Sequence, residues 1–241
     1  MSFSPIGIQN TLSQFHINNA QIQLSATDKN SYPGTGTVWS DLSGKARTGT
    51  LTNGPTFFTA NGGGFTFDGT NDFVNILRPS ASISTTDLTF NIWAKYPSNA
   101  AAFLAFNDWS SPFSWLFSFY DRRMYFKLRN TADVDMFNVS GSGSLITGQI
   151  LNPNTIYNVC CTWERSTKTA KIYINGVQEA SAVSALANVD IRSTTNVFAI
   201  ARSDGTVYYA GTVYNAFAVY RLYSAAEVLQ NYNVAKYLYG Y

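Results

Sequence analysis

The sequence predicts an all-β domain, a sandwich of two antiparallel sheets followed by one short C-terminal helix. Several segments alternate apolar with polar residues, clusters of Gly, Asn, Asp and Ser separate them, and only one segment has helical spacing. The chain has 241 residues, of which 45% are hydrophobic, so it can bury a sizeable core.

The expected strands follow one another with turn residues between them. Asn175-Gly176 marks the clearest hairpin, because both positions of a type I′ turn need positive φ. Asp121, Arg122 and Arg123 mark another turn. The strands are expected at residues 87–96, 115–120, 124–128, 156–163, 170–174, 177–180, 197–201 and 212–222, with Trp39, Trp93, Trp115 and Trp163 as core candidates.

The expected helix begins after Ser224. Ser224 and Glu227 have the spacing of a capping box, in which each side chain bonds a backbone N–H near the other residue. Val228, Leu229 and Tyr232 then follow at helical spacing, which predicts a helix as far as about Tyr237. The tyrosine-rich end, residues 237–241, is typical of a packing tail.

The first 19 residues differ from the rest of the chain. They are rich in Ser, Asn and Gln but carry spaced apolar side chains, which a solvated linker does not need. We expect residues 1–19 to form a docking arm, on this chain or another, and residues 20–241 to form the sandwich; the alternative is a first strand with a frayed terminus. The apolar residues of the arm are Phe3, Ile6, Ile8, Leu12, Phe15 and Ile17.

Composition excludes several partners and settings. Charged residues make up 12% of the chain and the net charge is +2, so the clustered Lys and Arg needed for nucleic acid are missing. No apolar run approaches the roughly 20 residues that span a bilayer. Residues 1–7 lack the basic region and the continuous apolar region of a secretory signal. We therefore expect the protein to mature in a reducing cytoplasm, with Cys160 and Cys161 as buried, unpaired thiols.

Four stretches together resemble one family. They are residues 32–44 (YPGTGTVWSDLSG), 64–74 (GFTFDGTNDFV), 172–177 (IYINGV) and 219–233 (VYRLYSAAEVLQNYN). The chain resembles the laminin-G-like group of the concanavalin A-like lectin/glucanase superfamily over about residues 20–236, especially the versions in virion proteins of tailed bacteriophages. The resemblance implies a jelly-roll sandwich with one concave and one convex sheet. Residues 45–48 (KART) depart from the Asn- and Gly-rich pattern of the family, which argues against a cation site in that loop.

Catalytic chemistry is not expected. Glycosidases need two closely spaced carboxyl groups. Of the three glutamates, Glu164 is expected at the end of a strand, Glu179 after the hairpin turn and Glu227 in the helix cap. Asp133 and Asp135 would share one face of a strand, but without a nearby partner we interpret them as solvated. The single histidine, His16, lies in the arm, far in sequence from both cysteines, which argues against a Cys–His pair or a Ser–His–Asp triad.

One group of residues has the right chemistry for a metal ion. Asp68, Asn71 and Asp72 offer oxygen ligands that suit a structural Ca²⁺, the one cofactor that the chain could hold. Tight turns select the same residue types, and we favour the turn.

A loop between two expected strands offers a candidate carbohydrate site. Trp109 has Asn107 and Asp108 beside it, and an exposed aromatic ring next to polar side chains marks a contact surface. The alternative is that Trp109 folds back and closes the sandwich.

The leading hypothesis is a non-enzymatic structural protein of a tailed-phage virion, either a capsid decoration protein or a tail or fibre component. It would be assembled in the host cytoplasm and anchored by residues 1–19 to other virion proteins or to copies of itself, with a trimer as the assembly by analogy. The alternative is a lectin-like, carbohydrate-binding module that recognises host or environmental glycans. Both roles can coexist in one protein, and a glycoside hydrolase is less favoured than either.

Overall fold

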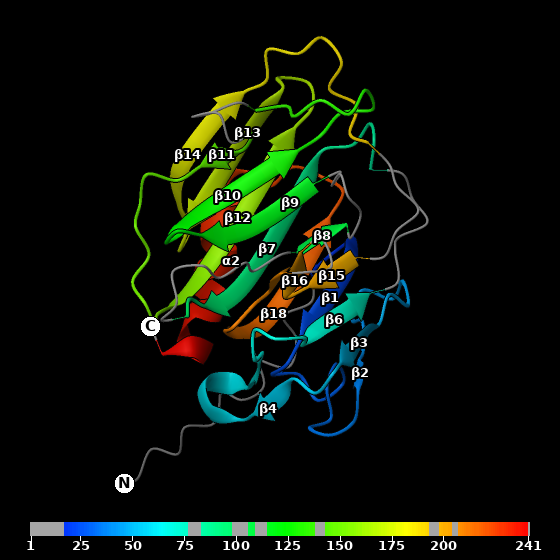
Figure 1. Cartoon of the computed structure of the whole chain (residues 1–241), viewed down its shortest axis with the longest axis vertical. Coiled ribbons are helices and arrows are strands. Elements are labelled where there is room, and N and C mark those ends of the chain that lie inside the picture. Colours follow the sequence, from blue (N-terminus) through cyan, green and yellow to red (C-terminus); the bar gives the residue numbers. More distant parts are fainter. Residues whose placement is uncertain are drawn as a thin grey trace, which may run out of the picture.

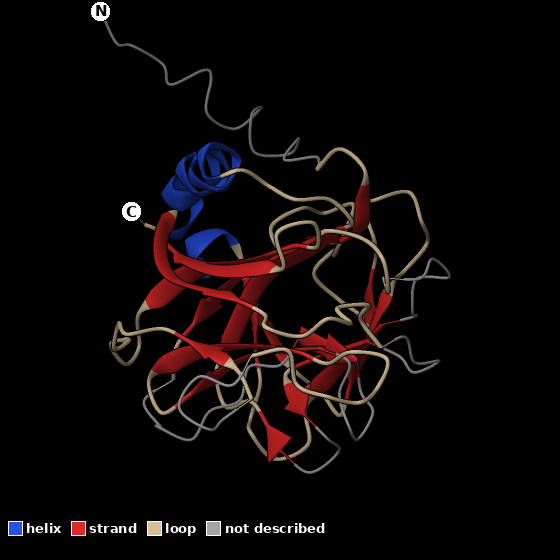
Figure 2. Ribbon diagram, turned by 90° about the horizontal axis from the view of Figure 1, so that it is seen from above, coloured by secondary structure: helices blue, strands red, loops and turns tan. Residues whose placement is uncertain are grey.

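The computed structural model describes residues 17–76, 83–97, 106–108, 115–137, 143–192, 198–203 and 207–240, with the backbone alone at 106–108 and 203. Two antiparallel sheets pack face to face, and the C-terminal helix lies over the outer face of one of them (Figure 2). The predicted fold class, a sandwich of two antiparallel sheets with one short C-terminal helix, is confirmed.

The first sheet, sheet A, carries the helix. Its strand order is β14-β13-β12-β7-β18-β5-β4, and β1 also pairs with β18. Its strands are β1 (Ala20–Ser25), β4 (Thr56–Phe58), β5 (Gly64–Thr66), β7 (Leu88–Lys95), β12 (Ile156–Glu164), β13 (Thr169–Ile174), β14 (Val177–Val183) and β18 (Thr212–Val219).

The second sheet, sheet B, has the order β11-β10-β9-β8-β15-β6-β3-β2 (Figure 1). Its strands are β2 (Val38–Trp39), β3 (Gly49–Thr52), β6 (Phe73–Ile76), β8 (Phe106–Asp108), β9 (Trp115–Tyr120), β10 (Arg123–Leu128), β11 (Leu145–Ile146) and β15 (Phe198–Ile200). A separate pair joins β16 (Arg202–Ser203) to β17 (Val207–Tyr208), and a 3₁₀ turn, η1 (Ala60–Gly62), lies between β4 and β5.

The main core fills the space between the two sheets. Alternation along β9 sends Trp115, Phe117 and Phe119 inward, and all three are fully buried. Trp115 stacks on Phe90 of β7, with ring centroids 4.5 Å apart, so the ring pair joins the two sheets. Each such ring contributes about 1.5–3 kcal/mol on burial. The four tryptophans predicted for the core, Trp39, Trp93, Trp115 and Trp163, are all buried.

A second apolar layer covers the outer face of sheet A. Helix α2 (Ala225–Ala235) continues into a 3₁₀ turn, η2 (Lys236–Tyr239), and the two cover Trp93 of β7. The Trp93 ring lies 4.4 Å from the ring of Tyr239 and 5.7 Å from that of Tyr232. The central strands β7, β12 and β18 are therefore buried on both faces.

The predicted cap and hairpin are present. The Ser224 hydroxyl accepts a hydrogen bond from the Glu227 N–H, and the Glu227 carboxylate accepts one from the Ser224 N–H at 2.8 Å. The α-helix ends at Ala235, earlier than predicted, because the chain tightens into η2. Asn175 and Gly176 have φ angles of 51° and 81°, as a type I′ turn requires.

The two cysteines are free and buried, as predicted. They are neighbours on β12 and lie on its opposite faces. Cys160 belongs to a cluster under helix α2, whereas Cys161 belongs to the core between the sheets. Burial raises the pKa of both thiols well above the ordinary value.

Candidate functional site

Asp68, Asn71 and Asp72 form a tight turn. One oxygen of Asp68 accepts hydrogen bonds from the N–H groups of Thr70 at 2.8 Å and Asn71 at 3.3 Å, and Asp72 accepts one from the Asp68 N–H at 3.1 Å. These N–H donors lower the pKa of Asp68, while burial raises that of Asp72. The geometry favours the turn, and the calcium site stays a prediction. No group of three or more His, Cys, Asp and Glu within the described ranges could hold a metal ion.

The predicted carbohydrate residues fall at the limit of what the structure describes. Asn107 and Asp108 lie in β8, where the register sets Asn107 opposite Leu116 of β9 and Ala199 of β15. Their side chains and the whole of Trp109 lie outside the described residues. This site stays a prediction, located on sheet B.

The arm is described only at its end. Phe3, Ile6, Ile8, Leu12 and Phe15 lie outside the described residues, and so the division into an arm and a domain stays a prediction. Ile17 is 5% exposed, and strand β1 begins at Ala20.

Asp133 is exposed in a loop, as expected for a solvated residue, but the expectation that Asp133 and Asp135 have no nearby partner is wrong. Asp135 forms ion pairs of 2.9 Å with both Lys127 and Arg129, and Asp133 lies 3.4 Å from Arg129. Asn130 stabilises the loop that carries Asp133, because its side-chain oxygen accepts hydrogen bonds from the N–H groups of Ala132 and Val134. The chain thus folds back onto the end of β10, where Lys127 and Arg129 lie. The alternation of apolar and polar residues does not predict this return.

The three glutamates have separate structural positions. Glu227 caps helix α2. Glu164 accepts a hydrogen bond of 2.8 Å from the Thr167 hydroxyl in the turn after β12, and Glu179 lies in β14, at the edge of sheet A.

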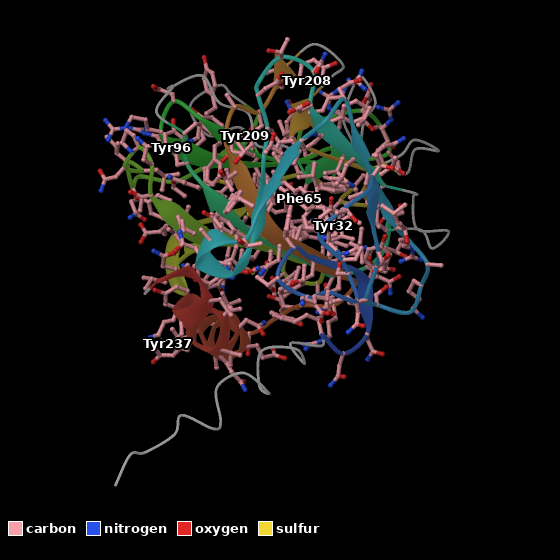
Figure 3. The ribbon with its side chains drawn as sticks, turned by 90° about the horizontal axis from the view of Figure 1, so that it is seen from below. Tyr32, Phe65, Tyr96, Tyr208, Tyr209 and Tyr237 are labelled. Carbon is pink, nitrogen blue, oxygen red and sulfur yellow. The ribbon has the colours of Figure 1, made fainter. Side chains whose placement is uncertain are left out.

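Most aromatic rings lie inside the molecule, as Figure 3 shows for Tyr32 and Phe65. The Arg202 guanidinium covers Phe73 at 4.6 Å and Tyr208 at 5.5 Å. Tyr237 is 71% exposed on η2. Because most rings are buried, a group of exposed rings on one pair of strands is a candidate contact surface.

Two tyrosines lie together on the outer face of sheet B, on the β9–β10 hairpin. Tyr120 is 43% exposed and Tyr125 is half-buried, and their centroids are 5.8 Å apart at 73°. Arg123 pairs with Tyr120 across the hairpin, so its side chain lies on the same face. We call Tyr120, Asp121, Arg123 and Tyr125 the hairpin surface.

A strained turn holds the hairpin surface in place. Asp121 and Arg122 have φ angles of 46° and 60°, which cost a non-glycine residue about 1–2 kcal/mol each. Arg122 offsets this cost, because its N–H bonds the Tyr96 hydroxyl and its Nε bonds the Leu151 carbonyl, both at 2.9 Å. The rigid turn fixes Asp121 and Arg123 beside the rings.

The hairpin surface combines ring faces with charged groups. Burial raises the pKa of Tyr125; the Asp121 carboxylate raises it further, and the Arg123 guanidinium opposes both effects. A ligand with apolar C–H faces and hydroxyl groups fits this chemistry, because the rings offer stacking while the carboxylate accepts and the guanidinium donates hydrogen bonds. The sequence pattern predicts strands at residues 115–120 and 124–128 but does not indicate that Tyr120 and Tyr125 lie together. The pattern of one tyrosine on each side of a two-residue turn was the available signal.

Solved structures show how common this architecture is. The receptor-binding domain of botulinum neurotoxin type G superposes with a TM-score of 0.62 at 18% identity, over 90% of this chain and 51% of that one. The ligand-binding domain of botulinum neurotoxin serotype D, solved with N-acetylneuraminic acid, gives 0.65 at 13% identity, over 89% and 50%. The sialidase of Trypanosoma rangeli, solved with 2,3-difluorosialic acid, gives 0.64 at 15%, over 92% and 34%. This chain thus spans between 34% and 51% of those chains, and the likeness shows a shared fold.

Sequence comparison gives the family. No curated protein matches the chain as a relative. Within the described residues, no helix is long and apolar enough to cross a membrane. The laminin-G family model described as "Concanavalin A-like lectin/glucanases superfamily" matches residues 67–229, which include most of both sheets and the start of the helix. The chain therefore belongs to the concanavalin A-like lectin/glucanase superfamily.

Proposed function

We propose that the chain is a non-catalytic, lectin-like module that binds glycans through the hairpin surface. The observation that carries this proposal is the pair of tyrosine rings, Tyr120 and Tyr125, on a sheet face beside Asp121 and Arg123. The fold supports it, since one solved neighbour is a ligand-binding domain in complex with N-acetylneuraminic acid.

The hairpin surface keeps Tyr120 43% exposed, so we expect a modest affinity for a single glycan. A site of two rings and two charged groups suits a dissociation constant near 1 mM, which corresponds to about −4 kcal/mol. Several copies displayed together would bind a polysaccharide far more tightly than one copy, because each further contact becomes intramolecular.

The experiment is a glycan array followed by titration calorimetry with the best ligand. We expect Tyr120→Ala to weaken binding at least tenfold, because it removes the most exposed ring of the hairpin surface. Tyr237→Ala is the matched control, because Tyr237 is an exposed tyrosine on η2. Unchanged binding by Tyr120→Ala, or a wild-type protein that binds no glycan, would overturn the proposal. Release of reducing sugar from a bound polysaccharide would overturn its non-catalytic part.

We further propose that this module is displayed on a tailed-phage particle, as a capsid decoration protein or a tail or fibre component, with other virion proteins and copies of itself as partners. The motifs at residues 32–44, 64–74 and 219–233 support this setting, since they resemble phage virion proteins. The buried, unpaired thiols fit assembly in the reducing cytoplasm of a host.

Cryo-electron microscopy of purified particles tests the display. We expect the sandwich at a regular surface position, as a trimer or another closed assembly. Absence of the chain from purified particles would overturn the setting and leave glycan binding untouched.

A further inference from the structure

A row of three polar side chains crosses the outer face of sheet A. Thr212 of β18 pairs with Thr66 of β5 on one side and with Lys95 of β7 on the other. The sequence neighbours of these three residues belong to the core between the sheets: Phe65, Ala94 and Val213. Because side chains alternate along a strand, Thr66, Thr212 and Lys95 all point to the outer face.

A cavity lies over this row. Its lining consists of Thr66, Lys95, Tyr96, Pro97, Asn154, Ala210, Gly211 and Thr212. Its volume is about 190 Å³. An engineered protein cavity of about 150 Å³ holds benzene, so this one has room for a six-membered ring.

Hydrogen bonds of the main chain fix the wall of the cavity. The Tyr209 hydroxyl donates to the Lys95 carbonyl at 2.6 Å, and the Asn154 N–H donates to the Tyr96 carbonyl at 2.8 Å. Both bonds use the backbone of the lining residues that accept or donate them. The side chains of Lys95 and Asn154 therefore stay available to a ligand, on a wall that needs no ordering when the ligand binds.

The polar side chains of the cavity lack partners within the part of the chain that the structure describes. Thr212 is only 7% exposed, and its hydroxyl forms no hydrogen bond there and is not sealed from solvent. The Lys95 ammonium forms no ion pair with any described residue, and the Asn154 side chain forms no hydrogen bond with one. A nearly buried hydroxyl without a partner costs free energy, which a ligand that reaches it can recover.

The charge of the cavity selects the ligand. Lys95 is the one charged residue of the described lining, so an anionic group is favoured there over a cationic one. The threonine hydroxyls and the Asn154 amide can both donate and accept hydrogen bonds, as hydroxyl groups of a ligand require. We propose that this cavity is a second ligand site, which takes a sugar acid. Its carboxylate pairs with Lys95, and its hydroxyls bond the side chains of Thr212 and Asn154.

A titration followed by nuclear magnetic resonance of the backbone N–H groups tests the site. We expect D-glucuronate to shift the signals of Lys95, Gly211 and Thr212, with a dissociation constant near 1 mM. D-glucose lacks the carboxylate and acetate lacks the hydroxyls, so each should bind about fivefold more weakly. Equal binding of acetate would reduce the site to a simple anion site, and equal binding of glucose would remove the role of Lys95. Either result, or no shift at these residues, overturns the proposal.

Variants test the two named contacts. Lys95→Gln removes the charge and should weaken glucuronate binding about fivefold. Lys45→Gln is the matched control, because Lys45 is an exposed lysine in the loop before β3. Thr212→Val keeps the shape of the side chain and removes its hydroxyl, and should weaken binding about two- to tenfold. Unchanged binding by both Lys95→Gln and Thr212→Val would contradict the proposal.

The cavity and the hairpin surface can be tested separately. They lie on different sheets, so Tyr120→Ala should leave the binding of glucuronate at the cavity unchanged. A loss of glucuronate binding in Tyr120→Ala would assign the sugar acid to the hairpin surface and overturn the second site. An oligosaccharide that contains glucuronate forms the last arm: tighter binding than the monomer supports a polysaccharide as the source of the sugar acid, and equal binding supports a free sugar acid.

Discussion

Single side chains decide the geometry at the points where this fold departs from regular strands. Asn130 turns the chain back so that Asp133 and Asp135 meet Arg129, and Arg122 holds its own positive φ through two hydrogen bonds. Alternation along the sequence predicts which residues face inward, but it does not identify ion pairs that a returning loop creates. For the same reason, the partners of Asp135 and the pairing of Tyr120 with Tyr125 were not predicted.

Glu227 allows a prediction of pH dependence. The Ser224 N–H lowers the pKa of Glu227 below its ordinary value of 4.5, and Arg221 at 2.7 Å adds to the effect. A lowered folded pKa means that the charged form stabilises the fold above pH 4.5 and that this contribution is lost as pH falls through the folded pKa.

We therefore expect Glu227→Gln to reduce the free energy of unfolding by about 0.5–1 kcal/mol near neutral pH. In acid, where the wild-type carboxyl is also protonated, the two proteins should become equally stable. Urea unfolding of both at about pH 7 and about pH 3 measures this. A difference that stays constant with pH would show that the charge of Glu227 is not what stabilises the cap.

At the scale of elements, the long strands were predictable and most of the short ones were not, although the three-residue β15 falls inside the strand expected at 197–201. Strands β7, β12 and β18 have eight or nine residues, enough to show a pattern, whereas β2 to β6 have two to four. A segment of two to four residues becomes a strand because it pairs with a neighbouring strand. A local sequence pattern does not contain that pairing. The candidate site was less predictable still, because it depends on which outward residues the hairpin brings together.

The turn between β13 and β14 also positions helix α2. Gly176 has a φ of 81°, and a Cβ at this position would lie 2.9 Å from the Leu229 side chain of the helix. We expect Gly176→Ala to cost about 2 kcal/mol, through backbone strain together with contact against the helix. Gly148→Ala is the control, because its added Cβ meets nothing within 4 Å and its φ is not positive. Equal unfolding free energies for the two variants would show that this turn does not constrain the helix.

At the scale of the whole molecule, three layers are stacked, two sheets and the C-terminal helical segment (Figure 2). The core between the sheets is far larger than the clusters under the helix. Local opening free energies follow the apolar contacts that must be broken, so the helix layer should open more readily than the sandwich. Cys160 lies under the helix layer and Cys161 between the sheets, which provides one natural probe for each interface.

We expect Cys160 to react first with a thiol reagent under native conditions. The comparison uses Cys161→Ser, which keeps only Cys160, and Cys160→Ser, which keeps only Cys161, each labelled with a disulfide reagent at neutral pH. Labelling of Cys161 should proceed at the rate set by global unfolding, and labelling of Cys160 should be at least tenfold faster, because detaching the helix exposes it while both sheets stay paired. Equal rates in the two variants would mean that helix and sandwich open as one unit, and that the covering of sheet A by α2 is as firm as the core itself.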